Sequence, residues 1–187
     1  MNFTIHTPDS APEEAKKILT EAQKNYGFLP NLLGIMASSP SLLEGYSILY
    51  KLFERTTFTP IEKHIVLLAV SYSNMCKYCV AAHTAIARQQ NISGDIIDAI
   101  RQGAPLSNLK LEALRRFTSA VVTTQGMPSP KDIEQFLNEG YTAANILDVI
   151  LGVGLKTLSN YTNHIADTSL DDAFSGCAWS NKSIGGD

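Results

Sequence analysis

Residues 59–89 read TPIEKHIVLLAVSYSNMCKYCVAAHTAIARQ, and they predict two consecutive helices with a cysteine pair at their junction. Thr59 and Glu62 have the spacing of a capping box, in which each side chain bonds the backbone amide of the other residue. An apolar run follows, so we expect a helix that ends near Asn74. The segment around Asn74 breaks this helix and caps the next one, which is expected from about Cys76 to Gln90.

The rest of the chain has the same helical period, with caps and breakers between the segments. Further helices are expected over about 11–26, 30–37, 39–56, 93–102, 108–124, 129–139 and 142–164. No segment has convincing period-two alternation bounded by turn residues, so a sheet is not expected. The predicted fold class is therefore all-α, with one helical domain over 1–168. A C-terminal tail follows over 169–187, and its Phe174 and Trp179 could dock onto the body.

The composition is that of a globular protein built as one domain. The 187 residues are 44% hydrophobic and 18% charged. A net charge of −3 gives no electrostatic case for nucleic acid or an anionic membrane as a partner. The apolar run Ile65–Val70 is too short to span a bilayer, and the N-terminal residues lack a signal-peptide pattern, so we expect a cytoplasmic protein. Three cysteines do not make a disulfide framework, which leaves catalysis or metal binding for the close pair.

Cys76, Cys79 and His83 fall at positions i, i+3 and i+7 of the second helix and share one face. The free amides and the positive dipole end of a helix start stabilise a cysteine as thiolate. Reduction of a peroxide needs such a thiolate, a proton for the leaving oxygen and a second thiol that resolves the sulfenic acid. The three side chains can supply these roles, with His83 placed to exchange a proton with Cys79.

The same three residues could instead bind zinc, because a CxxC followed by a histidine provides three ligands. A structural zinc needs a fourth ligand, and no other candidate has a spacing that demands it. These candidates are Cys177, His6, His64 and His164. We therefore expect neither a metal nor another cofactor, and packing of the cysteines alone remains the other alternative.

Residues 59–89 closely resemble the core of the alkyl hydroperoxidase D and carboxymuconolactone decarboxylase superfamily. The resemblance rests on the apolar helix, Asn74, the CxxC and the AAH that follows. Weaker similarity covers most of residues 26–166, around a core motif at 59–90. The resemblance implies an all-α fold that assembles into trimers, dimers or hexamers.

The resemblance also implies roles for individual residues. Cys79 would be the peroxidatic thiol, Cys76 its resolving partner and His83 the relay histidine. The family's proton-relay glutamate usually lies twelve residues before the first cysteine, where this chain has His64. His64 could serve as the base instead, since an unperturbed histidine has a pKa of about 6.5. Tyr78 occupies the position between the cysteines that is often histidine in the family.

Tyr78, Glu62 and Asn74 are candidate supporting residues. Tyr78 could offer its hydroxyl to the site, and Asn74 belongs to the family-like motif. Glu62 is better explained by the capping box, because it lies about 200° around an ideal helix from His64. We expect Glu62 to support the helix start rather than the chemistry.

Together these features predict a thiol-dependent alkyl hydroperoxide reductase that cycles through a sulfenic acid and a Cys76–Cys79 disulfide. The expected partners are a hydroperoxide substrate, an external dithiol or disulfide reductase as electron donor, a peroxiredoxin as a further candidate, and copies of the chain in a trimer or hexamer. Two alternatives remain: a decarboxylase-like lyase acting on a small lactone, and a non-catalytic redox sensor. Members of the decarboxylase branch generally lack the CxxC, which favours the redox branch.

Overall fold

The computed structural model describes residues 2–180, and its regular structure there is entirely helical. The helices are α1 (Glu13–Tyr26), α2 (Asn31–Met36), α3 (Pro40–Phe53), α4 (Pro60–Ser73), α5 (Lys77–Gln89), α6 (Gly94–Gln102), α7 (Leu109–Thr123), α8 (Pro130–Asn138), α9 (Ala143–Ala166) and the short 3₁₀ helix η1 (Asp172–Cys177). No strand occurs within residues 2–180, and the predicted all-α class is confirmed. The predicted helix boundaries agree with these to within a few residues.

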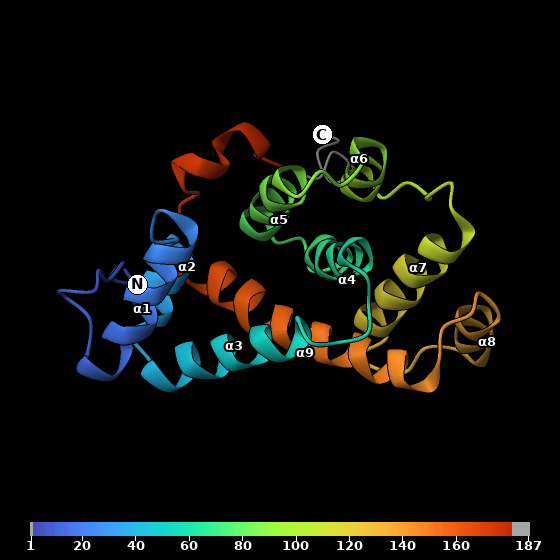
Figure 1. Ribbon diagram of the computed structural model, residues 1–187, viewed down its shortest axis with the longest axis horizontal. Helices are drawn as coiled ribbons and strands as arrows, with labels where there is room; N and C mark the ends of the chain where they lie inside the picture. Colours follow the sequence, from blue (N-terminus) through green and yellow to red (C-terminus); the bar gives the residue numbers. More distant parts are fainter. Residues whose placement is uncertain (1, 181–187) are drawn as a thin grey trace.

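Helix α4 is the central element of the fold. It packs against α5, α6, α7 and α9, and Figure 1 shows it enclosed among them. Its buried side chains include Ile65, Val66, Leu68 and Val70. A helix that is apolar on nearly every side is expected to be surrounded by other elements, as α4 is here.

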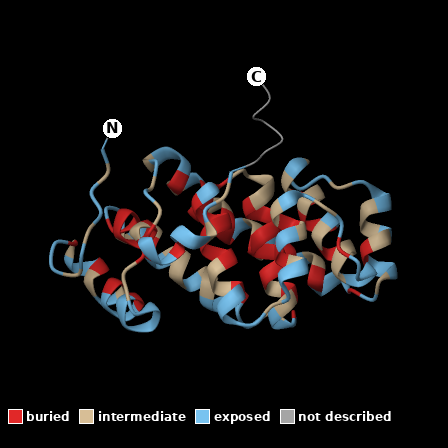
Figure 2. Cartoon of the chain, turned by 90° about the horizontal axis from the view of Figure 1, so that it is seen from above, coloured by how far each residue is buried: buried red, intermediate tan, exposed pale blue. Residues whose placement is uncertain are grey.

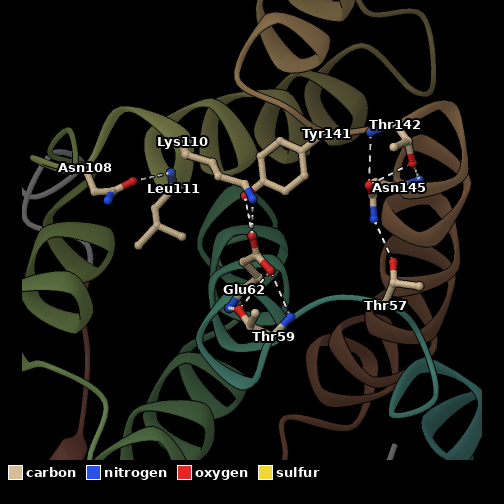
Figure 3. A network of polar contacts seen from close by, with 9 residues as sticks. All are labelled: Thr57, Thr59, Glu62, Asn108, Lys110, Leu111, Tyr141, Thr142 and Asn145. Atoms are coloured by element: carbon tan, nitrogen blue, oxygen red, sulfur yellow. Dashed lines mark hydrogen bonds and ion pairs between the residues drawn. The ribbon is translucent and has the colours of Figure 1, made fainter.

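The predicted capping box opens α4. The Thr59 hydroxyl accepts from the Glu62 amide, and the Glu62 carboxylate accepts from the Thr59 amide at 2.8 Å. The other carboxylate oxygen accepts from the Tyr141 hydroxyl at 2.9 Å and lies 3.7 Å from the Lys110 ammonium (Figure 3). Burial raises the pKa of Glu62, but the bonds from Thr59 and Tyr141 and the Lys110 charge outweigh it and lower the pKa. Glu62 therefore ties the start of α4 to the segment between α8 and α9.

Two groups of buried apolar side chains form the core, and Figure 2 shows buried residues on the inward sides of the helices. The first group lies among α4, α7, α8 and α9, where the Phe136 ring stacks on Phe117 and on Tyr141, each at 4.4 Å between centroids. The second group lies among α1, α2, α5 and η1, and it includes Cys76 and Cys79. The cysteine pair is therefore part of a packed core.

The chain after α9 packs on the body of the protein. Phe174 in η1 is buried, and its ring lies 6.1 Å from that of Tyr78 between centroids. Trp179 donates its indole N–H to the Arg101 carbonyl at 2.8 Å. Both aromatic side chains thus dock, as the sequence allowed. Residues 181–187, the rest of the predicted tail, lie outside the described residues.

Several large apolar side chains on α3 and α9 are exposed. They are Ile48, Leu52, Leu147, Ile150, Tyr161 and Ile165. The four on α9 fall within one narrow arc of the helix, because their spacings are close to whole numbers of turns. Such an exposed stripe is compatible with self-association, and the homo-oligomer stays a prediction.

Between residues 2 and 180, no helix by itself has the length and apolar character needed to cross a membrane. Helices α8 and α9 meet those criteria only as a pair, by length and composition alone, and the pair is bent by 115°.

Gly152 marks a close crossing of α9 with its neighbours, and we expect Gly152→Ala to be destabilising. A β-carbon there would lie 2.7 Å from Val66 Cγ1 and 2.9 Å from Phe53 Cε2. The overpacking should lower the free energy of unfolding by about 1–3 kcal/mol. Urea unfolding at constant protein concentration measures the change.

Gly154→Ala is the matched control, because no heavy atom outside its own helix turn lies within 4 Å of the added carbon. Its better helix propensity should raise the free energy of unfolding by up to about 1 kcal/mol. Equal unfolding midpoints for the two variants would contradict the close crossing.

Candidate active site

The cysteine pair lies where the chain turns from α4 into α5. Asn74 is the C-cap residue of α4, Met75 has a left-handed φ of 58°, and Cys76 is the N-cap residue of α5. The Cys76 amide donates to the Ser71 carbonyl at 2.9 Å. Both thiols are free and almost fully buried. Cys79 therefore lies in the first turn of α5, near the positive end of the helix dipole.

Three side chains from α9 surround the sulfur atoms. Asn163 Nδ2 donates to Cys79 Sγ at 3.2 Å and lies 3.8 Å from Cys76 Sγ. Ser159 Oγ lies 3.8 Å from Cys79 Sγ. The ammonium of Lys156, whose side chain is buried, acts on Cys79 through its charge and through a hydrogen bond. The three residues share one face of α9, because they are spaced i, i+3 and i+7.

The pKa values of the two thiols are shifted in opposite directions. Burial raises the pKa of Cys79, but the hydrogen bond from Cys76 and the charge of Lys156 outweigh burial. A hydrogen bond from Ser159 adds to them, and the pKa of Cys79 is lowered well below its ordinary value. For Cys76, the hydrogen bond to Cys79 and burial raise the pKa. These directions favour a reduced pair in which Cys79 is the thiolate and Cys76 the thiol.

His83 contacts Lys156, and Lys156 in turn reaches the thiolate. The Lys156 Nζ and His83 Nε2 atoms are 2.8 Å apart. Burial and the charges of Lys156 and His64 lower the pKa of His83 well below its ordinary value. The imidazole is therefore neutral, and its Nε2 accepts the bond from the ammonium. The proton exchange expected between His83 and Cys79 would pass through Lys156.

Lys156, Ser159 and Asn163 are functional candidates that the sequence did not reveal. Lys156 follows the apolar run 149–155, VILGVGL, inside the last helix. A charged side chain in such a run is usually paired when it is buried. This pattern could have marked Lys156 as a functional candidate. Ser159 and Asn163 carry no comparable signal, because polar residues are common towards a helix end.

His64 lies one step further from the sulfur atoms. Its Nε2 is 2.9 Å from Gln90 Oε1, and its Nδ1 is buried with no hydrogen-bond partner among residues 2–180. His64 is close enough to His83 for its charge to lower the pKa of that residue. The described part of the chain shows no hydrogen bond from His64 to either cysteine. Its role as a substitute base stays a prediction.

The three supporting candidates hold the surroundings of the site. The Tyr78 hydroxyl donates to the Asp171 carboxylate at 2.5 Å, which fastens the segment after α9 to α5. Asn74 Nδ2 donates to Asn160 Oδ1 at 2.9 Å and joins the end of α4 to α9. Glu62 is engaged at the opposite end of α4, where it acts as a capping residue. These contacts hold neighbouring helices together around the site and do not involve the sulfur atoms.

Two cavities adjoin the pair, one for each cysteine. The smaller cavity, of about 50 Å³, reaches Cys79. Its walls include Tyr26, Tyr46, Tyr50, His83, Lys156 and Phe174. The larger cavity, of about 480 Å³, reaches Cys76. Its walls include Lys77, Asn163, His164, Asp167, Thr168 and Trp179.

A zinc site would need a cluster of ligating side chains, and the part of the chain that the structure describes contains none. Across residues 2–180, no three His, Cys, Asp or Glu side chains are grouped closely enough to hold a metal ion. Cys177, a candidate fourth ligand, lies instead beside Arg88, with Nη1 at 3.5 Å from its sulfur.

Lys156→Met should raise the pKa of Cys79, because the charge and the hydrogen bond of the ammonium are lost while the side-chain volume is nearly kept. In the unchanged chain, the thiolate should persist as the pH falls below about 8.5, where an ordinary thiol becomes protonated. The ultraviolet absorbance of the thiolate, followed against pH in a Cys177→Ser background, gives the titration midpoint of Cys79 with and without Lys156. Lys110→Met is the control lysine, and a Lys156→Met titration that matches it would refute the assignment.

Comparisons with known proteins agree with this architecture. Residues 46–120 match the model of the carboxymuconolactone decarboxylase family. Among solved structures, an alkylhydroperoxidase AhpD core protein from Ralstonia eutropha, described as an uncharacterized peroxidase-related protein, is 21% identical with a TM-score of 0.82. The alignment covers 92% of this chain and 93% of that one.

Two other solved structures are similar over most of their length. A peroxidase-related protein from a Silicibacter species is 20% identical with a TM-score of 0.76, covering 88% of each chain. The debrominase Bmp8, in a variant bound to 2,3,4-tribromopyrrole, is 17% identical with a TM-score of 0.79, covering 95% of each chain. No curated protein matches the sequence. The family match covers the cysteine motif, and the fold is shared with these solved structures over nearly the whole chain, so both findings support the predicted resemblance to the alkyl hydroperoxidase D-like and carboxymuconolactone decarboxylase superfamily.

Proposed function

We propose that this protein is a thiol-dependent hydroperoxide reductase in which Cys79 attacks the peroxide and Cys76 resolves the product. The observation that carries the proposal is the position of Cys79 in the first turn of α5, with Asn163 Nδ2 donating to its sulfur at 3.2 Å and Cys76 one turn before it, and the thiol pKa values agree with this geometry. The pKa of the Cys79 thiol is lowered, and the pKa of the Cys76 thiol is raised. A thiolate nucleophile and an adjacent protonated thiol are the two reactants that the cycle needs at the outset.

The oxidative half of the proposed cycle consists of two displacements. The Cys79 thiolate attacks the terminal oxygen of the hydroperoxide, the O–O bond breaks, and the leaving alkoxide takes a proton to become an alcohol. The sulfenic acid on Cys79 is then attacked by Cys76, the S–O bond breaks, and the leaving hydroxide takes the Cys76 proton to form water. One disulfide, one alcohol and one water result, and an external dithiol must return the two electrons.

Lys156 is the proposed donor of the alkoxide's proton. Its ammonium is bonded both to the thiolate and to the neutral His83. His64 comes next, near His83, and its bond to the exposed Gln90 leads towards solvent. In this proposal His83 and His64 return a proton to Lys156 after each turnover, in place of the family's glutamate.

The volume of the Cys79 cavity supports a small oxidant. One water needs about 10–15 Å³ of such space, so a cavity of about 50 Å³ holds only a few water-sized molecules. Hydrogen peroxide or a short alkyl hydroperoxide fits this space better than a tribrominated pyrrole, the ligand of the structurally similar debrominase. The cavity's tyrosines and Phe174 favour a short alkyl group over a charged one.

Cys79→Ser should abolish peroxide turnover, with a loss of more than about 10³-fold, because the nucleophile is removed. In the absence of added thiol, Cys76→Ser should still consume one equivalent of peroxide and then stop with a sulfenic acid on Cys79. Dimedone labelling detects that acid, and a coupled assay with dithiothreitol measures turnover.

Cys177→Ser is the control thiol and should keep full turnover. The same variants separate the two alternative functions. A lactone decarboxylase would keep its activity in Cys79→Ser, and a redox sensor would oxidise once without sustained turnover in the unmodified chain. Either result would replace the proposed function.

His64→Ala should slow the peroxide reaction by roughly tenfold or more, because the return path of the proton is interrupted. The titration midpoint of Cys79 should change little, since the ammonium of Lys156 remains. His6→Ala is the control histidine, remote in sequence from the cysteine motif. Unchanged single-turnover rates and an unchanged pH profile in His64→Ala would exclude His64 from the relay.

A further inference from the structure

We propose that the larger cavity beside Cys76 is the binding site of the thiol reductant, which attacks Cys76 Sγ of the disulfide and expels Cys79. The inference rests on the proposed function and adds to it the place and the direction of the reductive step. Peroxide and reductant would then reach the pair through different cavities, each through its own cysteine.

The two cavities differ in the sulfur atom that they reach and in their size. Cys79 belongs to the wall of the smaller one, and Cys76 belongs to the wall of the larger one. Their volumes are about 50 Å³ and about 480 Å³. A dithiol reductant is larger than a small peroxide and has to bring two sulfur atoms to the disulfide, so only the larger cavity has room for it.

The thiol pKa values favour attack at Cys76. In thiol–disulfide exchange the sulfur with the lower pKa leaves faster. Cys79 is the better leaving group, because the Lys156 charge and the Asn163 amide stabilise its thiolate. The incoming thiolate must then bond to Cys76, the cysteine that faces the larger cavity.

Unpartnered polar atoms in the larger cavity indicate what kind of reductant it takes. Asn163 Oδ1 and Thr168 Oγ1 are buried and have no hydrogen-bond partner among residues 2–180. A ligand with an amide or hydroxyl group near its thiols could satisfy them. Lys77 and Asp167 place charges of both signs on the wall, which favours a neutral molecule. The class is therefore a neutral dithiol with a hydrogen-bonding group.

The segment after α9 forms part of the wall of this cavity. Leu170, Ala178 and Trp179 line it. The Tyr78–Asp171 bond and the bond from Trp179 to the Arg101 carbonyl hold the segment in place. The docked C-terminal segment thereby contributes to a site for which the sequence alone gave it no role.

The reductive step balances with a dithiol. One reductant thiolate attacks Cys76 Sγ, the Cys76–Cys79 bond breaks, and its electron pair leaves on Cys79 as thiolate. The second reductant thiol then attacks the reductant sulfur bound to Cys76. That bond breaks, Cys76 leaves and takes a proton, and the reductant departs as a disulfide with two electrons fewer.

The direction of attack can be mapped because Lys77 separates the two cysteines. Trypsin cleaves after Lys63, Lys77 and Arg88, so Cys76 falls in peptide 64–77 and Cys79 in peptide 78–88. The disulfide is formed with diamide in a Cys177→Ser background and treated with N-acetylcysteamine, a neutral monothiol with an amide. Acid quenching, alkylation and mass spectrometry then locate the adduct.

The expected adduct is on peptide 64–77, with the alkyl group on peptide 78–88. An adduct mainly on peptide 78–88 would overturn the inference while leaving the peroxidase proposal intact. Diamide makes the disulfide without peroxide, so this result does not depend on peroxide turnover. Failure of peroxide itself to form the disulfide would count against the proposed function instead.

Filling each cavity separately gives an independent test. Ala178→Trp, at an exposed position on the wall of the larger cavity, should raise the KM for dithiothreitol by about threefold or more. The rate of the peroxide half-reaction should not change. Ile86→Phe, on the wall of the smaller cavity, is the matched control and should slow the peroxide half-reaction only. An unchanged KM for dithiothreitol in Ala178→Trp would overturn the assignment of the cavity.

Discussion

A buried cation beside a buried sulfur is the interaction on which the proposed chemistry depends. Burial alone would keep Cys79 protonated, since removing a charge from water is costly. The hydrogen bond from the Cys76 thiol and the charge of the Lys156 ammonium together outweigh burial and lower the pKa of Cys79, and the Ser159 hydroxyl adds a further hydrogen bond. Lys156 is itself buried, so each charge compensates for the desolvation of the other. His83 completes the arrangement by accepting from the ammonium in its neutral form.

The local features of the site could be predicted because they depend on residues close together in the sequence. The capping box at Thr59, the helix start at Cys76 and the shared face of the cysteines all follow from short spacings and helical geometry. Lys156 and Asn163 could not be predicted in this way. They lie about eighty residues further along the chain, and the prediction of a helix over 142–164 does not say which of its faces meets α5. That face is decided by packing, including the close approach of Gly152 to Val66 and Phe53.

The position of the family's glutamate shows the same difference between what local sequence can predict and what depends on tertiary packing. The family resemblance indicated that His64 stands where a carboxylate is usual, and helical spacing indicated that Glu62 lies on another side of the helix. Neither indicated that a lysine from another helix lies next to the thiolate. A cation there changes the task of the relay. A carboxylate beside the pair would serve to remove a proton from a thiol, whereas the ammonium stabilises a thiolate that has already lost its proton. In the proposed cycle, His64 would therefore return protons and not abstract them.

Separate cavities for the two sulfur atoms have a consequence for the whole cycle. Cys79 is not among the residues that line the larger cavity, so a reductant bound there would leave the approach of peroxide to Cys79 open. The narrow cavity also limits what can meet the Cys79 sulfenic acid, and exclusion of a second peroxide would favour attack by the adjacent Cys76 over further oxidation. In the proposed cycle, the low pKa and the small cavity at Cys79, with the raised pKa and the larger cavity at Cys76, would make the two half-reactions chemically and spatially distinct. Tyr78 borders both cavities, and its hydroxyl is held by Asp171.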